Sequence, residues 1–441
     1  MKKLKFAVFI ILTLALTACG GGGDESGTPV NNSTLTPQPI DPEYTISPSR
    51  IAIPLSENRA LINVRLVSVS SSELSSSRSA LSFILYNFES SQVTTAFSLT
   101  LSDADLLADF GTIDATPVLF DLINTPDGGI AGQYTLFSNT TPQKTTLVIF
   151  KLNSDFSLAW SKKMASSDGY GRLQSVTDGY ISTGSTITKL DLSGELVYSK
   201  SSLSTFSATT VAGDTLVGSL NHYMLLDAQG DIINKFISGT KSDVFYYGIQ
   251  DSDNNMVMSG YTSLSGIGGR HLVLKTNEAG NPDYGIWLDL PAGASGFREI
   301  IEMQNSYYAA GVINEDISTS HGLICKFTKS LEIDICKSLQ NVNTGSDIYI
   351  REDKTNNRLY VSNIDTGSYP YILDKNLSPV KPLNTTWTTI DPFSYEWTPD
   401  WDNSDTPILD ISTTVNQANL AIIPTDTSVI DFSYFDTLFN N

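Results

Sequence analysis

The sequence predicts an all-β fold, a β-propeller of about eight four-stranded blades, from three observations. First, a unit of roughly 40–50 residues recurs along most of the chain, and each copy consists of two consecutive hairpins. Second, runs such as MVMSGY and HLVLK carry apolar side chains at successive positions, as strands covered on both faces do. Third, long stretches with a 3.6-residue apolar period are missing, whereas Ser, Thr, Asn, Gly and Tyr are abundant.

The clearest unit is Val244–Leu288, in which four apolar or aromatic runs alternate with turns. The first hairpin joins Val244–Gln250 to Met256–Tyr261 through the turn DSDNN. After the Gly-rich loop SLSGIGG, the second hairpin joins His271–Thr276 through NEAGN to a strand that ends at Trp287. This unit predicts one four-stranded blade.

The other units are located by the turn of the second hairpin, which follows the pattern K-L-D-x-x-G-x-L-x-W. Copies or faint candidates begin at Tyr86, Lys151, Lys189, Leu225, Lys275, Lys326, Ile372 and Pro424. A first hairpin precedes each, although only PILDISTTV is recognisable in the last unit. We therefore expect eight blades within residues 44–441. The alternative is seven blades plus an N-terminal β-sandwich at Tyr44–Thr116, because the first unit is the longest and least regular.

The N-terminus has the layout of a secretory signal over residues 1–18. Met1–Lys5 is basic, and Phe6–Leu14 is apolar but too short to span a membrane. The following LTAC resembles the lipobox of bacterial lipoproteins, which implies cleavage before Cys19 and acylation of this residue. Gly20, rather than Asp, implies outer-membrane sorting by the same resemblance, on either the periplasmic or the surface side. Residues 19–43 are rich in Gly, Pro, Ser and Asn and predict a flexible tether.

Residues Leu119 to about Leu339 resemble a known type of repeat. DNNMVMSGYTSLSGIGGRHLVLKTNEAGN is similar to the repeat of bacterial secreted propellers, which implies the fold and leaves the function open. Through DLSGELVYSK there is a weaker similarity to the PQQ-like repeats of the propeller lipoprotein that serves β-barrel assembly. The regular TGxxxW turn of that family is missing, so a role as an outer-membrane assembly scaffold is an alternative.

The formal net charge of the chain is −20. It becomes −23 when Lys2, Lys3 and Lys5 leave with the signal, because 24 basic residues then face 47 acidic ones. Such a surface repels nucleic acid and anionic lipid head groups and keeps the protein soluble. We expect no nucleic-acid partner.

The sequence offers little support for catalysis. His222, His271 and His321 share no local metal-binding spacing, and no nucleophile motif is present. We therefore expect a protein that is not an enzyme, although a site in the central channel is an alternative. Convergent polar residues at the axis would favour that alternative.

Two acidic stretches resemble calcium loops in their alternating oxygen ligands. In DWDNSD these ligands are Asp400, Asp402 and Asp405, and the other stretch is the turn Asp251–Asn255. Both lack the mid-loop glycine and the closing glutamate of an EF-hand. Turn chemistry explains Asp251–Asn255 better, so we expect no cofactor, and a bound Ca²⁺ at DWDNSD is the alternative.

Cys325 and Cys336 lie on opposite arms of one predicted hairpin, CKFTKSLEIDIC. Residues facing each other across a hairpin are within reach of a disulfide. Because the exported compartment is oxidising, we expect these two cysteines to be bonded.

The long loops predict where binding occurs. Links between the second and third strands, and links between units, emerge on one face of a propeller, and function concentrates on such loops. This face predicts an interaction module for an unknown envelope or surface protein or glycan. The link Asn384–Asp405 holds four aromatic candidates, namely Trp387, Tyr395, Trp397 and Trp401. Alternatively, these rings seal the joint between the last two blades.

Overall fold

The structure is a computed structural model that describes most of the chain beyond residue 43. The described residues are 44–55, 58–68, 80–165, 171–184, 186–201, 208–211, 214–218, 222–237, 243–264, 268–277, 280–290, 293–314, 320–339, 348–363, 370–381, 387–397, 415–425, 427 and 430–431. All of them belong to one compact unit, Asp41–Asn441. Within these ranges, no helix is long and apolar enough to cross a membrane.

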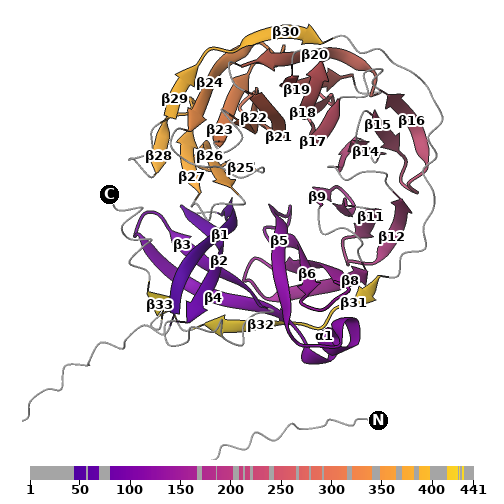
Figure 1. Ribbon diagram of the computed structural model, residues 1–441, viewed down its shortest axis with the longest axis vertical. Helices are drawn as coiled ribbons and strands as arrows, with labels where there is room; N and C mark the ends of the chain where they lie inside the picture. The colour runs from indigo at the N-terminus through magenta and orange to yellow at the C-terminus, as the bar shows by residue number, and fades with distance from the viewer. Residues whose placement is uncertain are drawn as a thin grey trace, which may run out of the picture. The chain divides into compact units, whose positions relative to one another are not determined.

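Seven sheets, each built on a four-stranded blade, form a ring, so the protein is an all-β propeller with seven blades (Figure 1). Blade 1 holds β1 (Tyr44–Pro54), β2 (Arg59–Ser68), β3 (Ala80–Asn87) and β4 (Gln92–Leu101). The helix α1 (Asp103–Phe110) links it to blade 2, which holds β5 (Ala115–Asn124), β6 (Ile130–Ser138), β7 (Thr145–Leu152) and β8 (Leu158–Ala165). Blade 3 holds β9 (Leu173–Val176), β10 (Gly179–Ser182), β11 (Thr186–Asp191) and β12 (Leu196–Ser201).

The remaining blades repeat this plan. Blade 4 holds β13 (Ala208–Val211), β14 (Asp214–Gly218), β15 (His222–Leu226) and β16 (Ile232–Ile237). Blade 5 holds β17 (Val244–Gln250), β18 (Met256–Leu264), β19 (Gly268–Thr276) and β20 (Pro282–Asp289). Blade 6 holds β21 (Gly293–Met303), β22 (Ser306–Asn314), β23 (Ser320–Phe327) and β24 (Ile333–Leu339). Blade 7 holds β25 (Ile348–Asp353), β26 (Arg358–Asn363), β27 (Tyr371–Asp374) and β28 (Pro379–Lys381).

Within each blade, consecutive strands pair antiparallel, and the first strand faces the centre of the ring. The outer pair of every blade carries a one-residue β-bulge just after the second hairpin's turn. The residues inserted there are Thr94, Ala159, Val197, Ile233, Asp283, Asp334 and Val380. A bulge increases the local twist of the strand, as a propeller blade requires at its outer edge.

The hydrophobic core lies between neighbouring blades. One cluster joins blades 1 and 2 through residues such as Phe83 and Phe150, and another joins blades 5 and 6 through residues such as Val273 and Phe297. Because each blade is covered on both faces, its strands do not alternate between apolar and polar residues. The runs of successive apolar residues that predicted the fold therefore arise because each strand is covered on both faces.

The predicted number of eight blades is wrong, because the last predicted unit does not form a blade. The described residues after blade 7 form five short strands, which we call the belt: β29 (Trp387–Ile390), β30 (Phe393–Trp397), β31 (Asn416–Gln417), β32 (Leu420–Thr425) and β33 (Ile430–Asp431). The belt runs back along the ring and adds an outer antiparallel strand to blades 6, 5, 2 and 1 in turn, and β33 pairs with β1 in parallel (Figure 1).

The alternative prediction named the right number of blades but gave the N-terminal unit the wrong role. β1–β4 form one blade of the ring rather than a separate sandwich, because blade 1 packs against both of its neighbours. On the side of blade 7, Ile62 and Tyr86 share a cluster with Tyr360, and the Phe88 and Tyr360 ring centroids are 5.7 Å apart. This contact closes the ring.

Candidate functional site

The two ends of the blades differ in how much of them the structure describes. One end, the hairpin-turn face, carries the short turns within each hairpin, and these turns are almost entirely described. The other end carries the long links that were predicted to bind a partner, and most of those links lie outside the described residues. The predicted binding face therefore stays a prediction.

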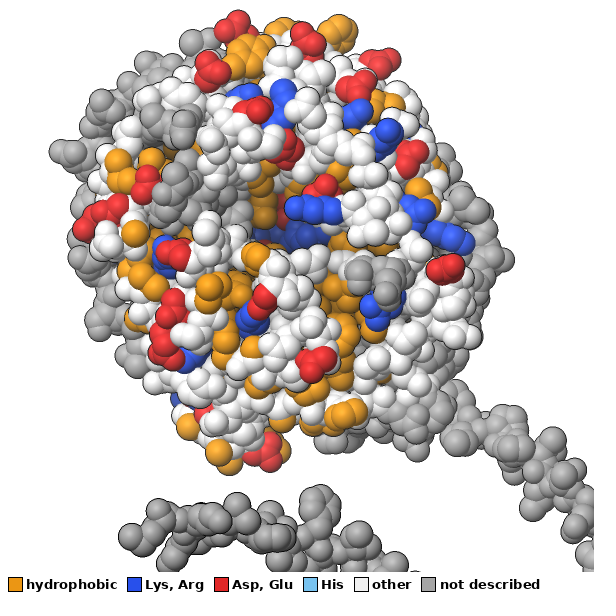
Figure 2. All heavy atoms as spheres, turned by 180° about the vertical axis from the view of Figure 1, so that it is seen from behind, with side chains coloured by type: hydrophobic (Ala, Val, Ile, Leu, Met, Phe, Trp, Pro, Cys, Tyr) orange, Lys and Arg blue, Asp and Glu red, His pale blue; other side chains and the backbone are white. Residues whose placement is uncertain are grey.

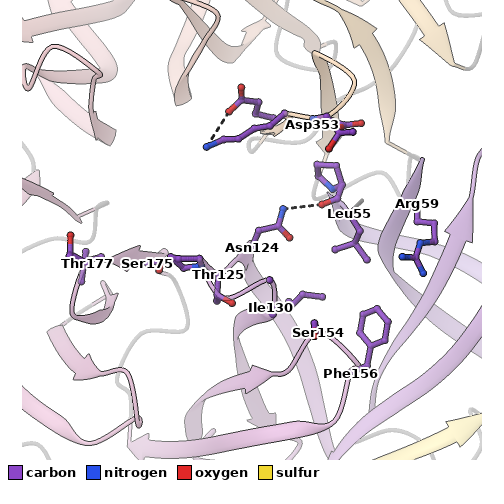
Figure 3. Close-up of a pocket in the computed structure, with 18 residues that line it drawn as sticks. Leu55, Arg59, Asn124, Thr125, Ile130, Ser154, Phe156, Ser175, Thr177 and Asp353 are labelled. Carbon is purple, nitrogen blue, oxygen red and sulfur yellow. Dashed lines mark hydrogen bonds and ion pairs between the residues drawn. The ribbon is translucent and has the colours of Figure 1, made fainter. Parts of the chain in front are cut away.

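A pocket of about 840 Å³ lies on the hairpin-turn face, and we call it the turn pocket (Figure 3). Its volume falls in the range of ligand-binding clefts. Turns from blades 7, 1, 2 and 3 line it, with residues that include Leu55, Arg59, Asn124, Ser154, Phe156, Ser175, Thr177 and Asp353. Seen from this side, which is the reverse of Figure 1, the ring is hollowed near its centre, with hydrophobic and basic side chains inside (Figure 2).

Blade 2 supplies more of the lining of the turn pocket than any other blade. The Asn124 side chain donates to the Pro54 carbonyl at 2.9 Å, which ties the turn of blade 2 to that of blade 1. Thr125 donates to the Asp127 carboxylate, which also forms an ion pair with Lys151. These two contacts hold the pKa of Asp127 at about 2. The first turn of blade 2 is therefore held in place from both sides.

Phe156 supplies the aromatic ring of the turn pocket from an unusual backbone position. Its φ is +64°, a left-handed value that costs a non-glycine residue about 1–2 kcal/mol. The Phe156 and Phe97 ring centroids are 5.8 Å apart, so the pocket ring rests on the core between blades 1 and 2. Blades 3, 4 and 5 place a glycine at the equivalent turn position.

Blade 7 supplies two adjacent carboxylates. Burial raises the pKa of Glu352, whose carboxylate lies 4.0 Å from the Lys354 ammonium. The Asp353 carboxylate accepts hydrogen bonds from the backbone of Thr355 and from Asn356, so it is used by its own turn. With Arg59 and Lys354, the pocket lining carries two acidic and two basic side chains.

Charged residues also converge at the axis of the ring, where they form what we call the axial cluster. Arg351 of β25 forms ion pairs with Asp121 of β5, at 2.5 Å, and with Glu299 of β21. The Arg172 guanidinium, just before β9, lies 3.8 Å from the centre of the Tyr349 ring and 4.0 Å from Glu299. Side chains from four blades thus meet at one point.

The backbone explains how two of these side chains reach the axis. Asp121 follows a β-bulge at Phe120, and Glu299 follows another in β21. Bulges redirect the side chain that follows them, and they are frequent beside functional sites. Burial raises the pKa of Glu299, although Arg351 and Arg172 oppose this effect.

The carboxylates of the axial cluster are hydrogen-bonded to their own surroundings. Asp121 accepts from the Leu173 amide at 3.0 Å, and Glu299 accepts from the Ile350 amide at 2.7 Å. Tyr349 donates to the Phe120 carbonyl at 3.0 Å. These bonds join first strands of different blades, so the axial cluster locks the ring together at its centre.

The predicted cysteine pair is a disulfide in the structure. Cys325 of β23 and Cys336 of β24 occupy paired positions, and their Cα atoms are 4.1 Å apart. Cys19 lies outside the described residues, as do the calcium candidates Asp400, Asp402 and Asp405. Within the described ranges, no group of three or more His, Cys, Asp or Glu residues could hold a metal ion.

The four aromatic candidates do not form one site among the described residues. Trp387 in β29 packs against the cluster between blades 6 and 7, whereas Tyr395 in β30 stacks on Trp287 of blade 5 at 4.3 Å between ring centroids. The stretch was expected to link the last two blades, but β29 and β30 lie on the outer edges of blades 6 and 5. The side chain of Trp397, and all of Trp401, lie outside the described residues.

The turn Asp251–Asn255, considered as a calcium loop, is occupied by protein groups. The buried Asp251 carboxylate accepts from the Tyr307 hydroxyl at 2.5 Å, and the Lys329 ammonium lies 3.4 Å away. Both partners belong to blade 6, so this turn joins two blades. His271 is fully buried in blade 5, where burial lowers its pKa to about 3.

Sequence reasoning missed the axial cluster. A signal was present, because Asp121, Glu299 and Arg351 are charged residues inside or beside apolar runs in the first strands of three units. A charged residue in the most enclosed strand of a repeat indicates a partner from another repeat. The turn pocket had no such signal, since its residues are ordinary turn residues.

Comparison with known proteins supports no assignment of function to this chain. No family model matches the chain, and no match was found among curated proteins. Solved structures that resemble it are distant. The Neurospora crassa Pan2 WD40 domain is 10% identical, with 61% of this chain and 78% of that chain covered and a TM-score of 0.41. The subtype N10 neuraminidase-like protein of A/little yellow-shouldered bat/Guatemala/060/2010 is 9% identical, with 81% and 95% covered and a TM-score of 0.30.

Identities this low carry no information on activity. The lipobox and the similarity to the assembly lipoprotein stay predictions, because neither the neighbours nor the described residues test them.

Proposed function

We propose that this chain is a lipid-anchored binding module of the bacterial outer membrane that holds a neutral glycan in its turn pocket. The observation that carries this proposal is the turn pocket, which is open, of ligand size and built from turns of four blades. The lipobox at Cys19 supports the anchor, and residues 19–43 supply the tether. No other partner class is required for attachment to the membrane.

The lining of the turn pocket favours a neutral glycan. Its hydroxyl and amide groups, among them those of Asn124, Ser154 and Thr177, match the hydroxyl groups of a sugar. The Phe156 ring offers an apolar surface for the C–H face of a sugar. Two acidic and two basic residues in the lining balance each other, so a strongly charged ligand gains no net attraction.

Polar residues do converge at the axis, which is the arrangement that would favour an enzyme, but in the axial cluster these charges act on each other. Ion pairs and amide hydrogen bonds already engage Asp121 and Glu299, so the cluster fixes the relative positions of the blades. A pocket formed by turns from four blades needs that rigidity to keep its shape. The long-link face and the aromatic rings of Trp387, Tyr395, Trp397 and Trp401 remain further candidate surfaces for a protein partner.

An enzyme is the second candidate function, favoured by the adjacent carboxylates Glu352 and Asp353. A carboxyl whose pKa is raised by burial suits a general acid, and Glu352 meets that condition. Against this role, the Asp353 carboxylate is bound to its own turn. An assembly scaffold, the other alternative, has no comparable support from the geometry of the described residues.

Isothermal titration with a mixture of neutral oligosaccharides of two to six sugars tests the proposal. Phe156→Gly removes the pocket ring at a backbone position that glycine prefers, so the turn keeps its shape. We expect the wild-type protein to bind and this variant to lose at least about tenfold in affinity. Leu377→Gly, at the equivalent turn of blade 7 and outside the pocket, is the matched control and should bind as the wild type does.

Equal binding by Phe156→Gly and the wild type would place the ligand elsewhere. Absence of binding by the wild type to any oligosaccharide in the mixture would refute the glycan proposal.

A further inference from the structure

The proposed function leaves a fully buried titratable residue unused, His271 of β19. Its ring centroid lies 4.6 Å from that of Phe297 in β21, so the ring belongs to the joint between blades 5 and 6. A Cβ atom on Gly311 of β22 would lie only 3.0 Å from two atoms of the ring. The imidazole therefore fills a space that exists because blade 6 places a glycine opposite it.

The joint between blades 5 and 6 holds this ring in its uncharged form. No hydrogen bond of normal geometry reaches either ring nitrogen of His271 among the described residues. Burial lowers its pKa to about 3, and the positive charges of Arg298 and Arg270 add to this effect. The backbone of Val312 opposes it, but the Val312 carbonyl already accepts from the Ser295 hydroxyl at 3.1 Å.

The other titratable groups around His271 do not compensate a positive charge on its ring. At this end of the surrounding strands, those groups are Tyr261 of β18, Arg270 of β19, Asp289 of β20, Arg298 and Glu299 of β21, and His321 of β23. Only the two arginines act on the charge of the ring. The Asp289 carboxylate pairs with Arg270 at 2.8 Å, and Glu299 pairs with Arg351 of the axial cluster. A protonated ring would thus be a buried charge without a counter-ion, which is costly.

The opposite end of the same joint responds differently to mild acid. On the hairpin-turn face, the Lys329 ammonium lies 2.5 Å from Glu302 and 3.4 Å from Asp251. Burial raises the pKa values of both carboxyls, but hydrogen bonds and the charge of Lys329 outweigh it and lower them. These ion pairs therefore persist below the ordinary carboxyl pKa of about 4. Mild acid weakens the joint at His271 while Lys329 still fastens its other end.

We propose that His271 makes the joint between blades 5 and 6 sensitive to acid, so that protonation of its ring opens the joint at this end. The proton comes from the solvent, and the imidazolium is stable only where water reaches it. The device concerns the response of the ring of blades to acid, so it goes beyond the proposed function and does not depend on the glycan.

The sign of the effect follows from the two states of the joint. An exposed histidine binds a proton near pH 6.5, whereas the enclosed ring does so only near pH 3. The stability of the closed joint is fully present above about pH 6.5 and is lost as the pH falls from there toward the lower value. Each pH unit within this window raises the population of the open joint about tenfold.

The disulfide Cys325–Cys336 supplies the readout, because both cysteines are buried in the hydrophobic cluster between blades 5 and 6. A water-soluble phosphine reduces this bond when the joint opens. For the full-length protein, we expect the reduction rate, normalised to the rate in concentrated urea at the same pH, to rise about 25-fold from about pH 7 to about pH 5. His271→Leu removes the titrating ring and should abolish this rise.

Ser259→Ala is the matched control. It removes a buried hydroxyl that has no hydrogen-bond partner among the described residues and pairs with β19 two positions from His271, without changing a titratable group. This variant should keep the rise of the wild type. An equal rise in His271→Leu and the wild type, or no rise in the wild type, would overturn the proposal.

An NMR titration of His271 keeps the proposal testable even if His271→Leu does not fold. Its ring resonance in the wild type, assigned with His222→Gln and His321→Gln, should keep the shift of a neutral imidazole down to about pH 5. A titration midpoint near pH 6.5 in the folded protein would overturn the proposal, since it would show that the closed joint accepts the charge.

Discussion

One turn position in blades 2 to 7 is filled in two different ways. It always has a positive φ, and it holds Phe156, Gly194, Gly230, Gly280, Leu331 or Leu377. Where it is glycine in blades 3 and 4, an aromatic ring of the preceding blade takes the space: a Cβ atom on Gly194 would lie 2.8 Å from Trp160. Where it is leucine in blades 6 and 7, the leucine side chain itself is buried. The space between neighbouring blades at this turn is therefore filled either by a ring of the preceding blade or by the leucine of the turn itself.

Leu377→Gly tests how much the buried leucine at this turn position contributes to stability. The change removes a buried side chain, which costs about 2–5 kcal/mol, but relieves a backbone strain of about 1–2 kcal/mol. We expect the free energy of unfolding to fall by about 2 kcal/mol in urea denaturation. An increase in stability would show that the strained backbone outweighs the packing of Leu377.

The sequence predicted part of this arrangement. The pattern K-L-D-x-x-G-x-L-x-W located the turns, and its last position is Trp160 in the unit that begins at Lys151 and Tyr198 in the unit that begins at Lys189. The leucines of blades 6 and 7 were not recognisable as turn residues, because a leucine rarely adopts a positive φ and only its burial explains why it does so here. The axial cluster was also missed, because its residues come from different blades and therefore show no fixed spacing in the sequence.

Ion pairs between blades form the next level of organisation. The Lys329 ammonium of blade 6 lies 2.5 Å from Glu302 and 3.4 Å from Asp251 of blade 5. Burial alone would raise the pKa values of these two carboxyls. Hydrogen bonds from Tyr307 to Asp251 and from Lys329 and Ser252 to Glu302, together with the charge of Lys329, lower them. This group fastens two neighbouring blades.

The lowered pKa values determine how stability depends on pH. Because the folded state binds these protons less readily than the unfolded chain, the contribution is fully present above the ordinary carboxyl pKa of about 4. It is lost as the pH falls through the lower, folded-state values. Lys329→Met leaves the buried Asp251 and the partly buried Glu302 carboxylates without their main cation, and should cost about 3 kcal/mol at pH 7.

Urea denaturation of wild type and Lys329→Met at pH 7 and at about pH 4 checks this prediction. The difference between the two proteins should shrink at the lower pH, where the carboxyls of the variant become protonated. A difference that stays constant with pH would mean that Lys329 acts through packing alone.

The sequence did not predict the belt. Its strands are short, contain aromatic residues and are separated by turn-like residues, so they look like one more pair of hairpins. Their true partners, such as β20 for β30 and β4 for β32, lie far away in the chain. Local patterns identify strands, but they do not show which distant edge a strand will join.

For the whole molecule, the sequence located all seven blades and was wrong about the eighth. The seven predicted units whose second hairpins begin at Tyr86, Lys151, Lys189, Leu225, Lys275, Lys326 and Ile372 correspond to β1–β28. The period of the repeat was sufficient for this, since each blade folds around local hairpins. The number of blades depends on how the ring closes, which happens between Tyr86 and Tyr360 and has no counterpart in the repeat.

The predicted lipid anchor at Cys19 determines where in the cell the whole ring is held. Cys19→Ala removes the residue that the lipobox marks for acylation, and each methylene group of a bound acyl chain contributes about 0.8 kcal/mol of membrane affinity. We expect the variant to remain uncleaved or to be soluble after cell fractionation with a high-salt wash. A fully processed variant that still pellets with the membrane would contradict this expectation.

The central claim is that the ring holds a neutral glycan without altering it. Native mass spectrometry of the wild-type protein, after incubation with the mixture of neutral oligosaccharides, tests this claim most directly. The account predicts one intact oligosaccharide per chain and no complex for Phe156→Gly. A shortened oligosaccharide formed by the wild type but not by Glu352→Gln would contradict it, and would identify the turn pocket as the active site of an enzyme.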